Sequence, residues 1–230
     1  MNIITGETTE NIETTSLRTQ SNVQTKISKK VYIKVKRVID VILASIALIL
    51  LSPLFAIIAI AIKIDSKGPV FFAHKRIGKN GNIIKLYKFR SMVINAEELI
   101  KSFTPEQMRE YKENYKLTND PRITKVGKFL RKTSLDELPQ LINIINGDLS
   151  IIGPRPVVAD ELEKYGTNKD KFLSVTPGLT GYWAANGRSN TTYEQRMEME
   201  LYYIDNLSLK MDIKVFFKTI LSVLKKEGAI

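Results

Sequence analysis

Two adjacent carboxylates, Asp136 and Glu137, are the residues of this sequence best suited to metal-binding or nucleophilic chemistry. Ser134 and Glu137 have the spacing of a capping box, so one reading is a helix that begins at Ser134 with two acids near the positive end of its dipole. Because Arg131 and Lys132 precede them, the other reading is a site that holds Mg²⁺ while one carboxylate attacks phosphorus. The sequence by itself leaves both readings open.

Two loops carry arginines that could bind phosphate. Arg155 lies between Pro154 and Pro156, and these prolines restrict its backbone, so a rigid loop would present a guanidinium suited to a bidentate grip on phosphate. The alternative is a turn with a solvated arginine. The second loop runs from residue 176 to Arg188 and holds the only tryptophan, Trp183, which either packs in the core or stacks on a base or lipid.

Composition excludes several kinds of chemistry. The 230 residues include no cysteine and one histidine, His74, which rules out thiolate metal sites, disulfides, cysteine nucleophiles and histidine triads. Neither a P-loop nor a dinucleotide-binding glycine motif occurs. The net charge of +11 favours phosphate-bearing partners, whether nucleic acid, nucleotide or anionic lipid. Any reaction must therefore use carboxylates, lysine, arginine, hydroxyls or a hard metal ion.

A long apolar segment is the strongest physical signal in the chain. The residues from Val41 to Ile62 are uncharged and almost all apolar, and as a helix they would measure about 33 Å, enough to cross a hydrocarbon core of about 30 Å. Ser52 and Pro53 lie in the middle of this segment, where the proline should bend the helix. Basic residues flank it on both sides, and both flanks therefore favour the cytoplasm. These features favour a re-entrant helix over a straight span.

A β-hairpin is predicted after the apolar segment. Residues 70–73 and 83–89 have strand character, and Asn80 with Gly81 between them is typical of a type I′ turn. This hairpin would carry Lys88 and Arg90 toward the membrane-proximal end of the domain.

The rest of the chain divides into regions of different composition. Residues 1–25 are polar without a sustained period, which predicts a disordered tail. Residues 26–64 form the basic segment and the re-entrant helix, and residues 65–230 a cytoplasmic, membrane-associated domain. Within it, residues 95–115 predict a solvated helix or mobile excursion, and residues 192–226 are helical with apolar stripes and a lysine-rich face, either facing the core or lying in the membrane interface.

The predicted fold class is α+β and mostly helical. It combines an N-terminal re-entrant membrane helix, a small β-hairpin and interfacial amphipathic helices around an active site built from loops.

The order of several motifs resembles the bacterial sugar transferases, the small monotopic phosphoglycosyl transferases that start the assembly of membrane-linked glycans. The resemblance covers about residues 31–228. Its motifs are the basic-flanked apolar helix with Ser52-Pro53, Tyr87-Lys88-Phe89-Arg90-Ser91-Met92, Asn119-Asp120-Pro121-Arg122-Ile123-Thr124, Ser134-Leu135-Asp136-Glu137-Leu138-Pro139-Gln140, Gly147-Asp148, Gly153-Pro154-Arg155-Pro156, and the loop from Pro177-Gly178 to Gly187-Arg188. Each motif alone is weak, whereas the ordered set is specific.

The resemblance implies transfer of sugar 1-phosphate from a nucleotide sugar, usually a UDP-sugar, to a polyprenol phosphate such as undecaprenyl phosphate. Asp136 would be the nucleophile that forms an aspartyl phosphosugar, and Glu137 would help hold Mg²⁺ or assist proton transfer. Asp148 would be a structural acid. The cations expected to bind phosphate or nucleotide are Lys88, Arg90, Arg155 and Arg188.

The expected partners are a UDP-sugar, a polyprenol phosphate and membrane lipid. The domain of residues 65–230 would be catalytic at the cytoplasmic face of the bacterial inner membrane, in the first membrane step of exopolysaccharide, capsule, O-antigen or glycoprotein glycan synthesis. No nucleic-acid partner is expected, because no recognisable nucleic-acid-binding motif accompanies the charge. A homo-oligomer is left open.

Two positions depart from the pattern of typical family members. Thr176 stands where they carry a basic residue before Pro-Gly, and Ala184-Ala185 stand where they carry Gln-Val. These departures weaken any inference about which sugar or base the loop recognises. The alternatives to the transferase are a non-catalytic basic module, anchored by one span and binding anionic lipid or nucleic acid, and a degenerate relative that scaffolds a pathway.

Overall fold

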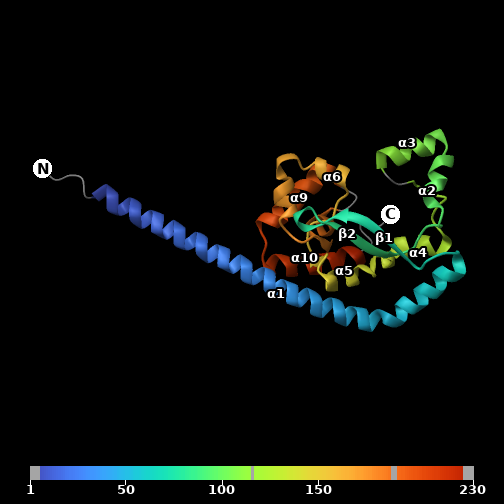
Figure 1. Ribbon diagram of the computed structural model, residues 1–230, viewed down its shortest axis with the longest axis horizontal. Coiled ribbons are helices and arrows are strands. Elements are labelled where there is room, and N and C mark those ends of the chain that lie inside the picture. Colours follow the sequence, from blue (N-terminus) through green and yellow to red (C-terminus); the bar gives the residue numbers. More distant parts are fainter. Residues whose placement is uncertain (1–5, 115–116, 188–190, 225–230) are drawn as a thin grey trace.

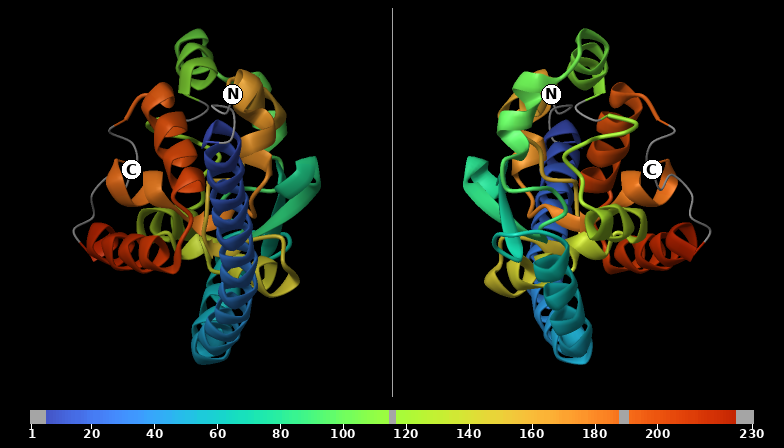
Figure 2. Two further views of the ribbon diagram at one scale, coloured as in Figure 1. Left: turned by 90° about the vertical axis from the view of Figure 1, so that its left-hand side faces the viewer. Right: turned by 90° about the vertical axis from the view of Figure 1, so that its right-hand side faces the viewer.

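One long helix, α1 (Gly6–Asp65), runs along the remainder of the chain and projects beyond it at its N-terminal end (Figure 1). The computed structural model describes residues 6–114, 117–187 and 191–224. The elements after α1 are β1 (Phe71–Ile77), η1 (Lys79–Gly81), β2 (Ile83–Phe89), α2 (Ala96–Leu99), η2 (Ile100–Ser102), α3 (Pro105–Asn114), α4 (Lys125–Thr133), η3 (Leu135–Glu137), α5 (Gln140–Asn146), β3 (Ser150–Ile152), α6 (Ala159–Glu163), η4 (Gly166–Asn168), α7 (Lys169–Leu173), β4 (Gly178–Thr180), α8 (Tyr182–Asn186), α9 (Tyr193–Asp205) and α10 (Leu209–Leu224). Seen along α1, the hairpin lies on one side of this helix and α9 and α10 lie on the other (Figure 2). The predicted mostly helical α+β class is confirmed.

The helix α1 is bent in its C-terminal part, and Pro53 lies inside it (Figure 1). Proline has no N–H, so the carbonyl of Ile49 loses its partner four residues on. The hydroxyl of Ser52 donates to this carbonyl oxygen at 2.8 Å. Ser52 and Pro53 therefore act together, because the serine supplies the hydrogen bond that the proline removes.

The N-terminal part of α1 differs from the expected disordered tail. The helix extends back to Gly6 and so includes most of residues 1–25. A nucleated helix adds further residues at little cost, and this stretch contains no proline that would stop it. Its order in solution stays a prediction.

The predicted hairpin is confirmed. Strands β1 and β2 are antiparallel and pair from Phe71 with Phe89 to Ile77 with Ile83. Asn80 has φ 57° and Gly81 φ 80°, and the N–H of Asn82 donates to the carbonyl of Lys79 at 3.2 Å. These are the features of a type I′ turn, for which asparagine and glycine are the preferred residues.

The core consists of three apolar clusters, and two of them contain residues of α1. Ala44 of α1 packs with Leu86 of β2 and Ile144 of α5, and Ile58 and Ile62 pack with Phe89. The third cluster contains no residue of α1 among those described; its buried members are Ile152, Val157, Tyr165, Phe172, Ala185, Tyr203, Ile204 and Val215. Between the clusters, β3 and β4 form a short parallel pair.

The two ends of the predicted helical region are separated by a turn. Residues 193–205 and 209–224 form α9 and α10 rather than one continuous helix, and Ser208 between them accepts a hydrogen bond from the Met211 N–H at 3.2 Å. The residues after Leu224 lie outside those described. Residues 96–102 and 105–114 are helical, in the short elements α2, η2 and α3.

Much of the apolar surface of α1 is left uncovered by the rest of the protein. The stretch Lys29–Asp65 is long and apolar enough to cross a membrane, and only 11% of its most apolar window is buried. Ile49 and Leu50 are each more than 70% exposed. A core helix would be covered, so this pattern supports membrane association. On α10 the exposed apolar residues are Leu209, Ile213, Phe216, Phe217, Ile220 and Leu221.

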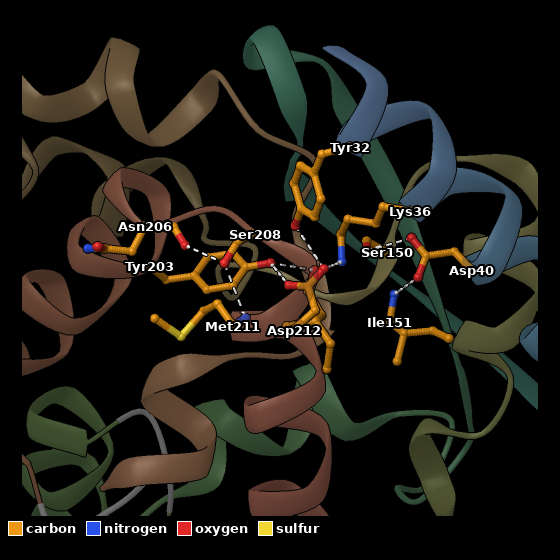
Figure 3. Close-up of polar contacts among 11 residues, drawn as sticks. Tyr32, Lys36, Asp40, Ser150, Ile151, Tyr203, Asn206, Ser208, Met211 and Asp212 are labelled. Carbon is orange, nitrogen blue, oxygen red and sulfur yellow. Dashed lines mark hydrogen bonds and ion pairs between the residues drawn. The ribbon is translucent and has the colours of Figure 1, made fainter. Parts of the chain in front are cut away.

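Polar contacts fix the start of the apolar segment to the domain (Figure 3). Asp212 of α10 accepts hydrogen bonds from Tyr32, at 2.7 Å, and Lys36, at 2.7 Å, both on α1. Tyr203 donates to the same carboxylate at 2.6 Å. Asp40 of α1 accepts from the hydroxyl of Ser150 at 2.7 Å and from the N–H of Ile151. We call Tyr32, Lys36, Asp40, Ser150, Tyr203 and Asp212 the junction cluster.

Candidate active site

A small pocket lies where the hairpin meets the loops of the domain. Its lining residues come from β1, β2, η3, α5, β4 and the loop before α6. They are His74, Arg76, Leu86, Lys88, Glu137, Gln140, Arg155, Pro156, Gly178 and Leu179. Segments from residue 74 to residue 179 meet here, so the pocket exists only in the folded chain.

The predicted capping box at Ser134 is wrong. Ser134 ends α4 in the left-handed region at φ 56°, and its side chain makes no capping hydrogen bond. Asp136 and Glu137 lie in the short 3₁₀ turn η3, and α5 begins only at Gln140, after Pro139. A 3₁₀ turn between two helices replaces the expected helix start, because α4 has to end before the chain can turn into α5.

The two carboxylates have different surroundings. Glu137 lines the pocket and forms an ion pair with Lys88, with 2.6 Å between Oε1 and Nζ. Asp136 is 9% exposed and is not among the lining residues. Burial raises the pKa of the Asp136 carboxyl, and the nearby charge of Lys88 opposes this shift. Asp136 is therefore a carboxylate held in a poorly solvated place behind the pocket wall, a condition that makes an anion more reactive.

The hairpin supplies most of the positive charge. His74 and Arg76 are two residues apart on β1, and Leu86 and Lys88 two apart on β2, so all four project from one face. Burial, followed by the charges of Arg76, Lys88 and Arg155, lowers the pKa of His74, which is therefore neutral at pH 7. The sequence analysis did not select Arg76 or His74, although their alternation in a predicted strand is a signal that could have found them.

The predicted phosphate ligands have different positions. Lys88 and Arg155 both line the pocket. Arg155 is exposed, and within the described part of the chain its guanidinium makes no hydrogen bond or ion pair. It lies 6.0 Å from the centre of the Trp183 ring. Arg188 lies outside the described residues.

Arg90 does not face the pocket. It is 6% exposed, and its guanidinium donates to the carbonyl oxygens of Ser66, at 2.8 Å, and Lys67. It thus holds the backbone that follows α1. In this geometry Arg90 anchors the backbone at the end of α1, and its binding of phosphate stays a prediction.

Asp148 makes the kind of structural contact expected of it. Its partner is Asn143, a residue that the sequence analysis did not select. The Asp148 carboxylate accepts from the Asn143 side chain at 3.0 Å. Asn143, fully buried, also donates to the Lys85 carbonyl and accepts from the Tyr87 N–H. Asn143 therefore fastens β2, which carries Lys88, to α5, which follows Glu137.

A second group of charged residues connects the hairpin to α6 and α9. Glu161 of α6 bridges Arg76 and Arg196, with 3.1 Å to each. Arg196 is 7% exposed and lies 4.8 Å from the Trp183 ring. Trp183 is half-buried and lies beside arginines rather than within the apolar clusters. Core packing therefore does not describe it, and stacking on a base or lipid stays a prediction.

The carboxylates suit a hard cation only together with other ligands. Within residues 6–114, 117–187 and 191–224, no group of three or more histidine, aspartate or glutamate side chains could hold a metal ion by itself. Mg²⁺ is commonly bound by one or two carboxylates plus the phosphates of a substrate. Asp136 and Glu137 fit this second arrangement.

An uncovered apolar helix and a cationic pocket beside two adjacent carboxylates define a membrane-associated protein whose pocket suits phosphate esters. The sequence profile of the bacterial sugar transferase family matches residues 31–226, and the chain belongs to this family. The resemblance inferred from the motifs is thereby confirmed.

Curated relatives cover the chain to different extents. It is 42% identical over 216 residues to the undecaprenyl-phosphate galactose phosphotransferase of Salmonella typhimurium, which covers 93% of this chain and 44% of that protein. It is 46% identical over 197 residues to the exopolysaccharide production protein ExoY of Rhizobium meliloti, covering 84% and 87% respectively. The UDP-glucose:undecaprenyl-phosphate glucose-1-phosphate transferase of Escherichia coli is 40% identical over 193 residues, covering 80% and 39%. The chain thus spans less than half the length of two of these relatives.

Proposed function

We propose that this protein transfers sugar 1-phosphate from a UDP-sugar to a polyprenol phosphate and releases UMP. The names of its relatives support the reaction class. The observation that carries the proposal is the buried Asp136 beside the Lys88–Glu137 ion pair. Phosphoryl transfer needs alignment and neutralisation of charge, and these residues offer a carboxylate nucleophile next to cations without histidine or cysteine.

In the proposed first step, an Asp136 carboxylate oxygen attacks the β-phosphorus of the donor. The bond from this phosphorus to the oxygen of UMP breaks, and an aspartyl phosphosugar remains. In the second step an oxygen of the polyprenol phosphate attacks the same phosphorus. The bond to Asp136 breaks, the carboxylate is regenerated, and the product is a polyprenyl diphosphate sugar.

The cations of the pocket would hold the donor. Arg155 has an exposed guanidinium on a proline-flanked loop, and Lys88 lies beside Glu137. When Mg²⁺ is bound, it neutralises charge on the diphosphate, and Asp136 and Glu137 are the residues that would hold it. Release of Lys88 from Glu137 would then let the lysine bind a donor oxygen.

The membrane helix would place this pocket at the surface where a lipid phosphate lies. We propose that α1 enters and leaves the membrane on the cytoplasmic side of a bacterial inner membrane. The bend with Pro53 and the packing of both Ala44 and Ile62 on one domain support this arrangement, because contacts on either side of the bend reach the same body.

The test of the reaction is UMP release by the full chain in nanodiscs, with undecaprenyl phosphate, Mg²⁺ and a panel of UDP-sugars. We expect release with at least one donor and none without lipid phosphate beyond a single turnover. Digestion after incubation with the active donor alone should give the peptide containing Asp136 with the added mass of a sugar phosphate. An unmodified peptide, while product forms once acceptor is added, would contradict the covalent step.

The test of the topology is cysteine labelling, which the absence of native cysteine makes direct. Single cysteines at Lys34 and Lys67, on either side of the apolar segment, should react with an impermeant maleimide from the same face of sealed vesicles. Labelling from opposite faces would establish a span instead of a re-entrant helix.

A further inference from the structure

The tripeptide Pro154–Arg155–Pro156 has a single backbone N–H, that of Arg155, because proline has none. This N–H donates to Oε1 of Glu200 at 3.0 Å. Glu200 comes from α9, 45 positions along the chain, and is 1% exposed. The one donor of this loop is therefore held by a buried carboxylate.

The residues around Arg155 are held from another direction. The Gly153 N–H donates to the Thr180 carbonyl at 2.8 Å, and the Gly178 N–H donates to the Pro154 carbonyl at 2.8 Å. A side chain on Gly178 would come within 2.1 Å of the Gly153 nitrogen, so the two backbones are in close contact. These bonds fix the loop up to Pro154 against β4, whereas Glu200 holds Arg155 itself.

Burying the Glu200 carboxylate costs more free energy than a purely structural contact would account for. Its second oxygen, Oε2, is buried without a hydrogen-bond partner among the described residues. Burial raises the pKa of Glu200 to about 7, although the Arg155 N–H and the charges of Arg196 and Arg155 oppose this. A buried, incompletely bonded carboxylate destabilises a fold relative to an apolar side chain, so a role beyond stability accounts better for its presence.

We infer that Glu200 is a positioning residue for Arg155: by accepting the only N–H of the Pro154–Pro156 tripeptide, it fixes the backbone from which the Arg155 guanidinium reaches the donor phosphates. The ligand named in this inference rests on the proposed function. The geometry rests only on the hydrogen bond from the Arg155 N–H to Glu200. In the proposed reaction Glu200 takes no part in the chemical steps.

The test compares Glu200→Gln with Glu200→Met. Glutamine keeps an oxygen that can accept the Arg155 N–H, whereas methionine has nearly the same shape and lacks a comparable acceptor. We expect the donor KM of Glu200→Gln to stay within about threefold of wild type and that of Glu200→Met to rise at least about tenfold, with kcat changed less. Glu200→Ala carries the same expectation as Glu200→Met if the methionine variant does not fold.

The control is Tyr203→Phe, on the same helix. The Tyr203 hydroxyl is buried and bonds to Asp212 and to the Ile152 carbonyl, away from Arg155. This variant should lower the unfolding temperature and leave the donor KM unchanged. If the effect of Glu200→Met came from a general loosening of α9, Tyr203→Phe would raise the donor KM as well, and that result would overturn the inference.

Two further measurements separate this inference from the proposed reaction. Hydrogen exchange of the Arg155 amide, the one exchangeable backbone site in the tripeptide, should be faster in Glu200→Met than in Glu200→Gln, whatever the protein catalyses. In an Arg155→Ala background, Glu200→Met should raise the donor KM no further. Wild-type exchange or wild-type KM in Glu200→Met, or independent effects of the two substitutions, would overturn the role of Glu200, whereas a wild-type protein that turns over no UDP-sugar would overturn the proposed function.

Discussion

The junction cluster and the pocket are both polar and both join distant segments, yet they differ in how their charges are matched. In the junction cluster the Asp212 carboxylate accepts from Tyr32, Lys36 and Tyr203 at 2.6 to 2.7 Å. In the pocket, Arg155 has an exposed guanidinium with no ion pair among the described residues. Asp136, next to the pocket-lining Glu137, is buried with a raised pKa.

This difference separates residues that hold the fold together from residues that could bind and react with a ligand. A cluster whose groups satisfy one another holds α1 on the domain. A cluster with an exposed cation and a poorly solvated carboxylate is less stable by itself and gains from an anionic ligand. Substitutions in the junction cluster should therefore change stability, and substitutions in the pocket should change activity.

The largest effect should come from Asp136→Asn. Loss of the nucleophile should lower UMP release by at least about 10³-fold. The folded carboxyl holds its proton to higher pH than the unfolded one, because burial raises its pKa; the ionised group therefore lowers stability at neutral pH. The asparagine variant should unfold at the same or a higher temperature in the same detergent. A variant that is both inactive and strongly destabilised would remove the distinction between the two clusters.

The next effect should come from Lys88→Met. Removal of a cation that faces the transferred phosphate should lower kcat/KM by about 10²-fold. Lys85→Met is the matched control, because Lys85 lies on the same strand, is exposed and does not line the pocket. We expect less than a twofold change from it. Equal losses in both variants would mean that the overall charge of the hairpin matters rather than the pocket.

A comparable test of the junction cluster is Asp212→Asn. This substitution removes one partner of a buried ion pair and leaves the charge of Lys36 uncompensated. Because Lys36 is partly exposed and asparagine still accepts hydrogen bonds, we expect a loss of about 2 kcal/mol in the free energy of unfolding. The donor KM should stay as in wild type. Asp205→Asn, which breaks the exposed pair with Lys171, should cost about 0.5 kcal/mol or less. A raised donor KM in Asp212→Asn would show that the two clusters are coupled.

The smallest effect concerns pH. Because burial raises the pKa of Asp136, the nucleophile should gain its proton at a higher pH than an exposed aspartate, and kcat should fall on the acid side of the profile with that apparent pKa. As the pH falls through the same interval, the contribution of Asp136 should raise the unfolding temperature, because protonation removes the buried charge. A midpoint at the ordinary value for aspartate would place Asp136 in water during the reaction.

Local sequence signals predicted the parts of the fold that depend on neighbouring residues. Pro53 and Ser52 are adjacent, and the bend depends on a carbonyl three or four residues away. Asn80 and Gly81 form their turn within four residues. The capping box failed, although it is also a local signal, because the left-handed Ser134 ends α4 before Asp136.

The family could be inferred from the order of motifs, since each motif keeps its residues in one short stretch. The assignment of Arg90 was different. The resemblance implies a phosphate ligand at Arg90 as at Lys88, yet the Arg90 guanidinium holds the backbone after α1. Spacing on a strand gives the face of a side chain and not the partner that it meets.

The sequence by itself determined a membrane-seeking helix with a bend, a hairpin with a defined turn, and a set of cations and carboxylates suited to phosphate. Only the tertiary structure decided which of them meet: Lys88 with Glu137, Arg155 with Glu200, and Asp212 with Tyr32, across 49, 45 and 180 positions. The physical reason is that hydrogen bonds and burial act over a few ångströms, while the residues that satisfy them are brought together by the packing of the whole chain.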